Sequence, residues 1–291
     1  MATTTGTVRR VQTRARPGPI PLVVEGITEI WSRRQLARYL VQADMVKHGA
    51  NTVLGNIWWV LDPLLQMAVY VIFVSVILGR GGKDYPLFVF SAILPWKWFS
   101  VSINDAITSV TTREGIIKQV KFPTIVLPVA ANASGVVSFA FGLVPLLGMI
   151  ILFYSDKLSL YLLFIPAIAF VQFFFTMSLC IVTAAVNVFF RDLTNLARHL
   201  LRLWFYLSPA LYATKDLDPA KYGLLAQLYK LNPWVPLFES YHNVIYGDPT
   251  TLVLKPPDWA GLAVLLVASM FLILLATLIF KRLEPAFAKV I

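Results

Sequence analysis

The chain has 291 residues, of which 58% are hydrophobic and 14% are charged, and its net charge is +10. A soluble domain has about 45–50% apolar and about 25% charged residues, so this composition excludes a water-soluble globular domain and favours an integral membrane protein. The single cysteine, Cys180, excludes a disulfide framework and a thiolate metal site. The three histidines lack metal-ligand spacing, so we expect no metal and no cofactor bound by this chain.

The N-terminal region predicts a tail followed by an interfacial helix. Residues 1–26 are rich in Arg and Pro and predict a disordered basic tail. Residues 27–56 predict a cytoplasmic amphipathic helix on the inner leaflet, because Arg34, Arg38 and Gln42 recur every four positions. The opposite, apolar face comprises Leu36, Tyr39, Leu40, Ala43 and Val46. A simple membrane anchor and a gate beside a cytoplasmic entrance both fit this pattern.

Residues 57–280 predict an all-α transmembrane domain of six spans. A span needs about 20 apolar residues to cross about 30 Å of hydrocarbon. The fifth run is too short unless the residues from Leu193 onward extend it. The six apolar runs are Ile57–Leu78, Leu87–Ile107, Ile125–Tyr154, Leu160–Phe190, Leu200–Ala213 and Trp259–Phe280.

The basic residues predict the orientation of these spans. With the N-terminus inside, 17 of the 25 Lys and Arg residues lie on the inner side and 7 on the outer side. The positive-inside rule therefore places both termini in the cytoplasm, with 281–291 as a cytoplasmic tail. Basic residues beside apolar runs favour an anionic bilayer surface over nucleic acid as the partner.

The segment 224–246, between the fifth and sixth runs, is apolar but broken by Asn232-Pro233 and Val235-Pro236. Backbone groups freed by such breaks need protein or water as partners inside a membrane. The pattern favours a re-entrant element that lines a cavity, and an external interfacial helix is the alternative.

No chemistry for ATP hydrolysis is visible in this sequence. The nearest approach to a phosphate-binding loop, residues 79–84, has the wrong spacing and lacks the Ser or Thr that would hold magnesium. We therefore expect a non-enzymatic subunit. Lys97 lies nearer the middle of a span, where it can attract a phosphate, snorkel or pair with Asp62. The tryptophans near span ends fit an interfacial belt, and they fit sugar stacking only if they face a lumen.

A set of motifs resembles one family. The order and content of these motifs are similar to permease subunits of ABC-type polysaccharide exporters, which handle O-antigen, teichoic acid, capsule or cell-wall galactan. The motifs are NTVLG at 51–55, WWVLDPLLQ at 58–66, LPW at 94–96, IIKQVKFPTIVL at 116–127, FRDL at 190–193, YLSPALY at 206–212 and LNP at 231–233.

This resemblance implies two permease copies and two ATP-binding cassette subunits, with ATP and Mg in the partner. It also implies roles for particular segments. The helix with Arg34, Arg38 and Tyr39 becomes a cytoplasmic gate. The expected ATPase-coupling residues are Arg113, Glu114, Lys118 and Lys121 in segment 111–122, with Arg191, Asp192 and His199 at a second contact. The expected external gate is 224–246, with Trp234, Phe238 and Tyr241.

The resemblance further implies export of a polyprenyl-pyrophosphate-linked polysaccharide across the plasma membrane. The expected substrate pathway comprises Trp58, Trp59, Asp62, Trp96, Lys97 and Trp98. The Arg-, Ala- and Pro-rich tail is typical of actinobacterial cell-wall proteins and favours galactan as the cargo. The alternatives are an ABC permease for drugs or small lipids, and a standalone secondary transporter or lipid-linked glycan enzyme, which predicts more intramembrane acids.

Overall fold

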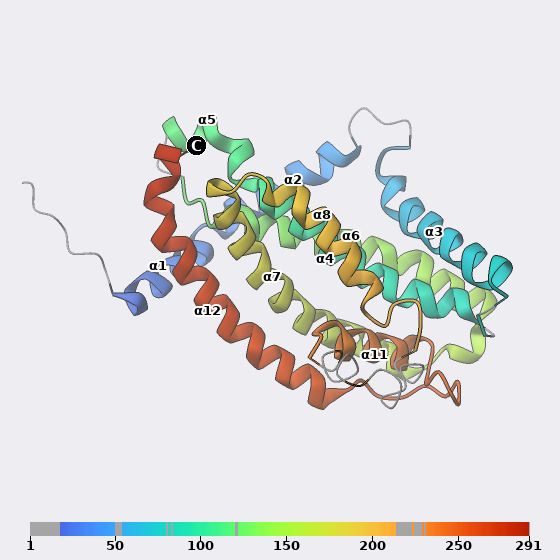
Figure 1. Ribbon diagram of the computed structural model, residues 1–291. Helices are drawn as coiled ribbons and strands as arrows, with labels where there is room; N and C mark the ends of the chain where they lie inside the picture. The colour runs from blue at the N-terminus through green and yellow to red at the C-terminus, as the bar shows by residue number, and fades with distance from the viewer. Residues whose placement is uncertain are drawn as a thin grey trace, which may run out of the picture.

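The computed structural model describes residues 18–49, 54–79, 81–82, 84–119, 122–213, 223, 229 and 231–290. Every regular element in these residues is a helix, which confirms the all-α class (Figure 1). Within this described part of the chain, five helices are long and apolar enough to cross a membrane. They are α3 (Trp58–Val71, continued by a π-helical turn at Ile72–Ile77), α4 (Tyr85–Ser109), α6 (Val126–Phe153), α7 (Ile165–Phe189, preceded by a 3₁₀ turn at Leu160–Phe164) and α12 (Trp259–Val290).

The bundle has two ends, which we name after the short helices α5 (Glu114–Gln119) and α11 (Trp234–Ile245) (Figure 1). At the α5 end, α7 and α12 both finish, and the rings of Phe189 and Phe287 are 6.0 Å apart. At the α11 end, α12 begins, and the rings of Phe164 and Trp259 are 5.4 Å apart.

A sixth crossing runs through α8 (Leu193–Tyr206). At the α5 end, Thr194 Oγ1 donates a hydrogen bond to Asn187 Oδ1 over 3.1 Å. At the α11 end, Tyr85 Oη donates to the carbonyl oxygen of Leu211 over 3.2 Å. This crossing starts at Leu193, which is the extension that the short run Leu200–Ala213 required; Arg198 and Arg202 lower the hydropathy of this extended first half.

α4 is the central helix, and α3 is the most peripheral. In the most apolar window of each helix, 78% of the residues of α4 are buried, whereas 6% of those of α3 are. α4 packs along α6, and α7 packs along α12. Figure 1 places α3 and α12 on opposite flanks of the bundle. α3 thus packs on the bundle with one side only and leaves nearly all of its residues at least partly exposed.

Two helices precede the bundle, and they correct the predicted N-terminal region. α1 (Pro19–Ser32) begins inside the segment 1–26 that was predicted to be a disordered tail, of which 1–17 lie outside the described residues. Proline is well tolerated in a first helical turn, and α1 gains its packing from α12. A Cβ on Gly26 would lie only 2.5 Å from Thr277 Cγ2, so the two helices approach closely at this glycine.

α2 (Arg34–Gly49) follows after a break at Arg33, so it contains the predicted amphipathic pattern, while residues 27–32 of the predicted segment 27–56 belong to α1. On the predicted apolar face, Leu40 is buried in the protomer, whereas Tyr39 and Val46 are exposed. α2 packs against α6. At the other terminus α12 continues to Val290, so the predicted tail 281–291 is mostly helical.

α11 is re-entrant. Its first residue, Trp234, lies beside Phe99 near the middle of α4, with ring centroids 5.0 Å apart. Just past its last residue, Tyr246 lies beside Phe88 near the start of α4, with ring centroids 5.2 Å apart. The helix thus runs from mid-depth back to the α11 end. Most of the residues before it, 224–228 and 230, lie outside the described part of the chain.

Candidate functional site

A cavity of about 470 Å³ opens between α2, α3, α4 and α6 on the side of the α5 end. Its wall combines two tryptophans, a lysine, three aspartates and small residues. These are Trp58, Trp59, Lys97, Asp44, Asp62, Asp105, Met45, Val101, Ser134, Gly135 and Ser138. The cavity therefore joins α2 to three of the long apolar helices.

An ion pair between Lys97 of α4 and Asp62 of α3 lies in the wall of this cavity. The Lys97 side chain is 20% exposed and the Asp62 side chain is 59% exposed. Pairing with Asp62 was one of the alternatives that the sequence left open for Lys97, and it is present. The pair also connects the peripheral helix α3 to the central helix α4.

A second cavity of about 490 Å³ continues toward the α5 end and shares Asp44 and Asp105 with the first. Asp44 connects three elements, because Arg113 Nη2 lies 3.8 Å from its Oδ1 and Ser134 Oγ donates to its Oδ2 over 3.3 Å. Asp44 was not among the residues predicted from sequence. The sequence feature that could have indicated its role is the position of this acid close to the apolar side of an amphipathic helix.

Only part of the predicted substrate pathway faces a cavity. Trp58, Trp59, Asp62 and Lys97 line the 470 Å³ cavity. Trp96 and Trp98 are core residues instead, only 6% and 1% exposed. Trp98 Nε1 donates to Asn132 Oδ1 over 3.1 Å, and the Trp96 ring lies 4.8 Å from that of Trp234. α4 is covered on nearly all sides, so its tryptophans pack within the protomer.

The predicted external-gate residues are also buried. Trp234, Phe238 and Tyr241 have no exposed surface. Tyr241 Oη donates to Gln172 Oε1 over 3.0 Å, and Phe238 packs on Trp234 with ring centroids 4.7 Å apart. In this conformation the three side chains hold α11 inside the bundle and do not line a lumen.

The predicted coupling residues gather at the α5 end. Lys118 Nζ donates to Glu114 Oε1 over 2.6 Å, and this hydrogen bond lowers the pKa of Glu114. Arg191 also acts on that carboxylate, so the turn after α7 shares this end with α5. Asp192 is exposed beside Arg191, and His199 is exposed about two turns into α8. Lys121 lies outside the described residues. On α2, Arg34, Arg38 and Tyr39 are exposed.

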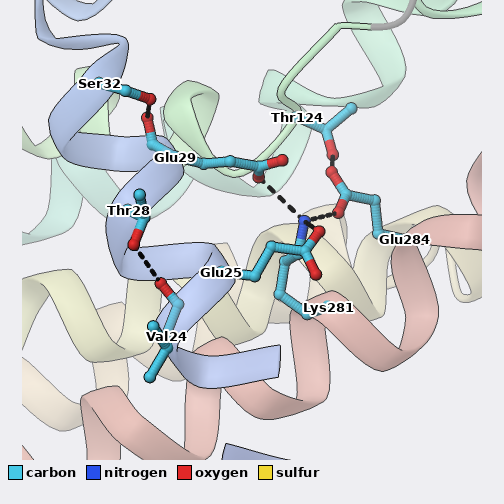
Figure 2. Close-up of polar contacts among 8 residues, drawn as sticks. All are labelled: Val24, Glu25, Thr28, Glu29, Ser32, Thr124, Lys281 and Glu284. Atoms are coloured by element: carbon cyan, nitrogen blue, oxygen red, sulfur yellow. Dashed lines mark hydrogen bonds and ion pairs between the residues drawn. The ribbon is translucent and has the colours of Figure 1, made fainter. Parts of the chain in front are cut away.

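A charge cluster around the buried Lys281 connects α1 to α12 (Figure 2). Lys281 is 5% exposed, and its ammonium group lies 3.1 Å from Glu25, 2.9 Å from Glu29 and 2.6 Å from Glu284. Thr124, just before α6, donates to Glu284. This cluster was not predicted from sequence, because two of the three carboxylates, Glu25 and Glu29, lie more than 250 positions earlier in the chain.

The apolar crossing helices, the re-entrant α11 and the cavity beside an interfacial helix define a multi-pass membrane protein. The chain belongs to the ABC-2 type transporter family, whose profile matches residues 35–246. Membership in a family of ABC transporters implies a partner that carries the ATP-binding cassette.

Curated relatives are named as permeases. The O-antigen export system permease protein RfbA of Myxococcus xanthus is 31% identical over 265 residues, which cover 90% of this chain and 98% of that protein. Two proteins of the same name from Klebsiella pneumoniae are each 26% identical over 253 residues, covering 87% of this chain and 93% of theirs.

Proposed function

We propose that this chain is the transmembrane subunit of an ATP-driven exporter for a polyprenyl-pyrophosphate-linked polysaccharide. The cargo passes from the cytoplasmic to the outer side of the plasma membrane. The observation that carries the proposal is the cavity lined by Trp58, Trp59 and Lys97 between α2 and the crossing helices. Relatives named for O-antigen export support a glycan as the cargo.

The chemistry of the cavity suits such a cargo. An ammonium group attracts the phosphates of a lipid-linked headgroup, and tryptophan faces stack on sugar rings. α2 lies beside the entrance, where a headgroup would arrive from the inner leaflet with its polyprenyl chain still in the bilayer. Asp62 holds Lys97 in place before the cargo binds.

The working complex contains two copies of this chain and two ATP-binding subunits. The α5 end, with Arg113, Glu114, Lys118, Arg191 and Asp192, is the docking surface for the ATP-binding subunits and faces the cytoplasm. ATP and Mg bind in that partner. Galactan is the cargo that the N-terminal composition favours.

The first experiment is purification of the chain from its native membrane. We expect a stoichiometric ATPase to accompany it, and ATP hydrolysis in liposomes to rise on addition of polyprenyl-pyrophosphate-linked glycan. Stimulation by small lipids or drugs alone would support the other type of ABC permease. Transport by the isolated chain without an ATPase would contradict the proposal.

Variants of Lys97 test the cavity directly. We expect Lys97→Gln to reduce glycan export at least about tenfold and Lys97→Arg to retain most of it, because arginine keeps the positive charge. The double variant Lys97→Gln with Asp62→Asn removes the unpaired carboxylate. If that double variant restores export, Lys97 serves only the ion pair and its role toward cargo is refuted.

A further inference from the structure

α8 carries two arginines on a face that the protomer does not cover. Arg198 and Arg202 are one helical turn apart and both exposed, whereas the buried stripe of α8 is Ala197, Leu201 and Phe205. Among the ion pairs found between described residues, none involves either arginine.

Ring contacts place Arg202 near the middle of the bundle. Trp204, two residues later, lies 5.6 Å from Phe99 and 6.3 Å from Phe175, measured between ring centroids. Phe99 and Phe175 lie near the midpoints of α4 and α7. Two residues advance a helix by only about 3 Å, so Arg202 lies close to this level. An arginine that faces hydrocarbon at mid-membrane is strongly unfavourable, and such residues normally face water or protein.

α3 adds a matching polar stripe. Asp62, Gln66 and Tyr70 recur every four residues, and α3 and α8 both run from the α5 end toward the α11 end. The Tyr70 side chain hydrogen-bonds with Gln66 and with Tyr206, which lies one turn after Arg202 on α8. We call Asp62, Gln66, Tyr70, Arg198, Arg202 and Tyr206 the α3–α8 polar face.

We infer that the α3–α8 polar face lines the water-filled conduit and that Arg198 and Arg202 bind a phosphate group of the cargo within the membrane. The inference rests on the proposed function for the existence of a conduit. Guanidinium groups bind phosphate through paired hydrogen bonds. The one carboxylate of the face, Asp62, is already paired with Lys97, so the arginines leave the face basic.

Two-fold symmetry between two copies favours cargo binding at this face over direct packing of the subunits. A two-fold axis beside this face would bring it against the same face of a second copy. Two basic faces repel each other, so they are stable together only with water and an anionic molecule between them. The face therefore fits the wall of a conduit better than a dry subunit contact.

Thiol labelling in the reconstituted complex tests whether the face is wet. Tyr206→Cys places a thiol one turn from Arg202, and Val264→Cys on the exposed side of α12 is the lipid-facing control. The native Cys180 is buried, so the chain without an added cysteine sets the baseline. We expect a charged methanethiosulfonate reagent to label Tyr206→Cys at least about tenfold faster than Val264→Cys, because these reagents react in water.

The same thiol reports the local charge. A unit charge about 6 Å away changes the rate of a singly charged reagent about threefold in water, in opposite directions for anions and cations. We expect Arg202→Gln to lower the anionic-to-cationic rate ratio at Tyr206→Cys about tenfold. The inference is overturned if Tyr206→Cys is labelled as slowly as Val264→Cys. It is also overturned if Arg202→Gln leaves the rate ratio unchanged, because an acid of a neighbouring subunit then neutralises Arg202.

Export of polyprenyl-pyrophosphate-linked glycan completes the test. We expect Arg202→Gln to reduce export severalfold, Arg202→Lys to restore most of it, and Arg282→Gln, at an exposed arginine of α12, to have no effect. Normal export by Arg202→Gln would refute cargo binding by this residue. If the wild-type complex exports no such glycan, the proposed function fails, and the labelling ratio still decides whether the face is wet and basic.

Discussion

Gly135 of α6 faces α4 where the two helices come closest. A Cβ at this position would lie 2.1 Å from Ser102 Oγ and 2.4 Å from Trp98 Cδ1. We expect Gly135→Ala to lower the free energy of unfolding by about 1–3 kcal/mol, because Trp98 is buried and cannot yield without strain. Thermal unfolding in detergent measures the change.

The matched control is Gly148→Ala in the same helix, where a Cβ meets nothing within 4 Å. That change should leave stability unchanged or raise it, since alanine favours a helix over glycine by about 1 kcal/mol. Equal melting temperatures for the two variants would show that α4 and α6 accommodate a methyl group at position 135 without loss of stability.

Asp248 organises the loop between α11 and α12. Lys255 Nζ donates to it over 2.6 Å, and the amides of Thr250 and Thr251 donate over 2.8 and 3.1 Å. These hydrogen bonds, the one from Lys255 first, lower the pKa of Asp248 well below its ordinary value. A lowered pKa means that the folded loop favours the carboxylate, so this stabilisation is complete above the ordinary aspartate pKa of about 3.9 and is lost as the pH falls toward the folded value.

We therefore expect the loop amides to keep their protection from hydrogen exchange, relative to the rest of the protein, from about pH 7 to about pH 4 and to lose it at lower pH. Asp248→Asn should weaken protection already at neutral pH and remove this pH dependence. An identical profile in both proteins would contradict the role of the carboxylate.

The tryptophans show what sequence can predict about single residues. Trp58 and Trp59 were placed on the pathway and do line the cavity, while Trp96 and Trp98 were placed there and lie in the core. In α4 the side that faces the cavity carries Lys97, Val101 and Asp105 at four-residue spacing, and Trp96 and Trp98 lie off that side. Asp44 could not be linked to Arg113, because that contact depends on how α2 packs on α6.

At the scale of elements, Lys281 is the buried contact between α1 and α12. We expect Lys281→Met to release α1, because three carboxylates then lose the cation that they share and removal of one partner from a buried ion pair is strongly destabilising. Faster tryptic cleavage at Arg33 and Arg34, between α1 and α2, reports the release.

Lys289→Met, at an exposed lysine of the same helix, is the matched control and should be cleaved at the wild-type rate. If Lys281→Met is cleaved no faster than this control, the apolar contact at Gly26 holds α1 without the charges.

Long apolar helices were predictable from sequence, and the helices that pack through polar residues were not. The run Ile57–Leu78 matches α3 and its π-helical turn within one residue, because about 20 apolar residues allow few other structures. α1 was missed because its stabilising contacts, Glu25 and Glu29 with Lys281, lie far away in sequence. The start of α8 was hard to recognise because Arg198 and Arg202, on its exposed face, lower the hydropathy of its first half.

For the whole molecule, the charge distribution predicts an orientation with the α5 end in the cytoplasm. Green fluorescent protein fused after Ile291 should fluoresce, because it matures only in the cytoplasm. Alkaline phosphatase inserted at 155–157, at the opposite end of the bundle, should be active. The reverse pattern would place the coupling residues outside the cell and refute the proposed contact with an ATPase.

The low burial of α3 has a consequence for the isolated protein. Only 6% of the residues in its apolar window are fully buried in the protomer, so this helix depends more than the others on its surroundings, either acyl chains or a neighbouring subunit. Measured stability should therefore vary with micelle composition and with protein concentration, as it does for any unit whose partner binds the folded form alone. Purification conditions that strip lipid or dilute the complex should loosen α3 before any other crossing helix.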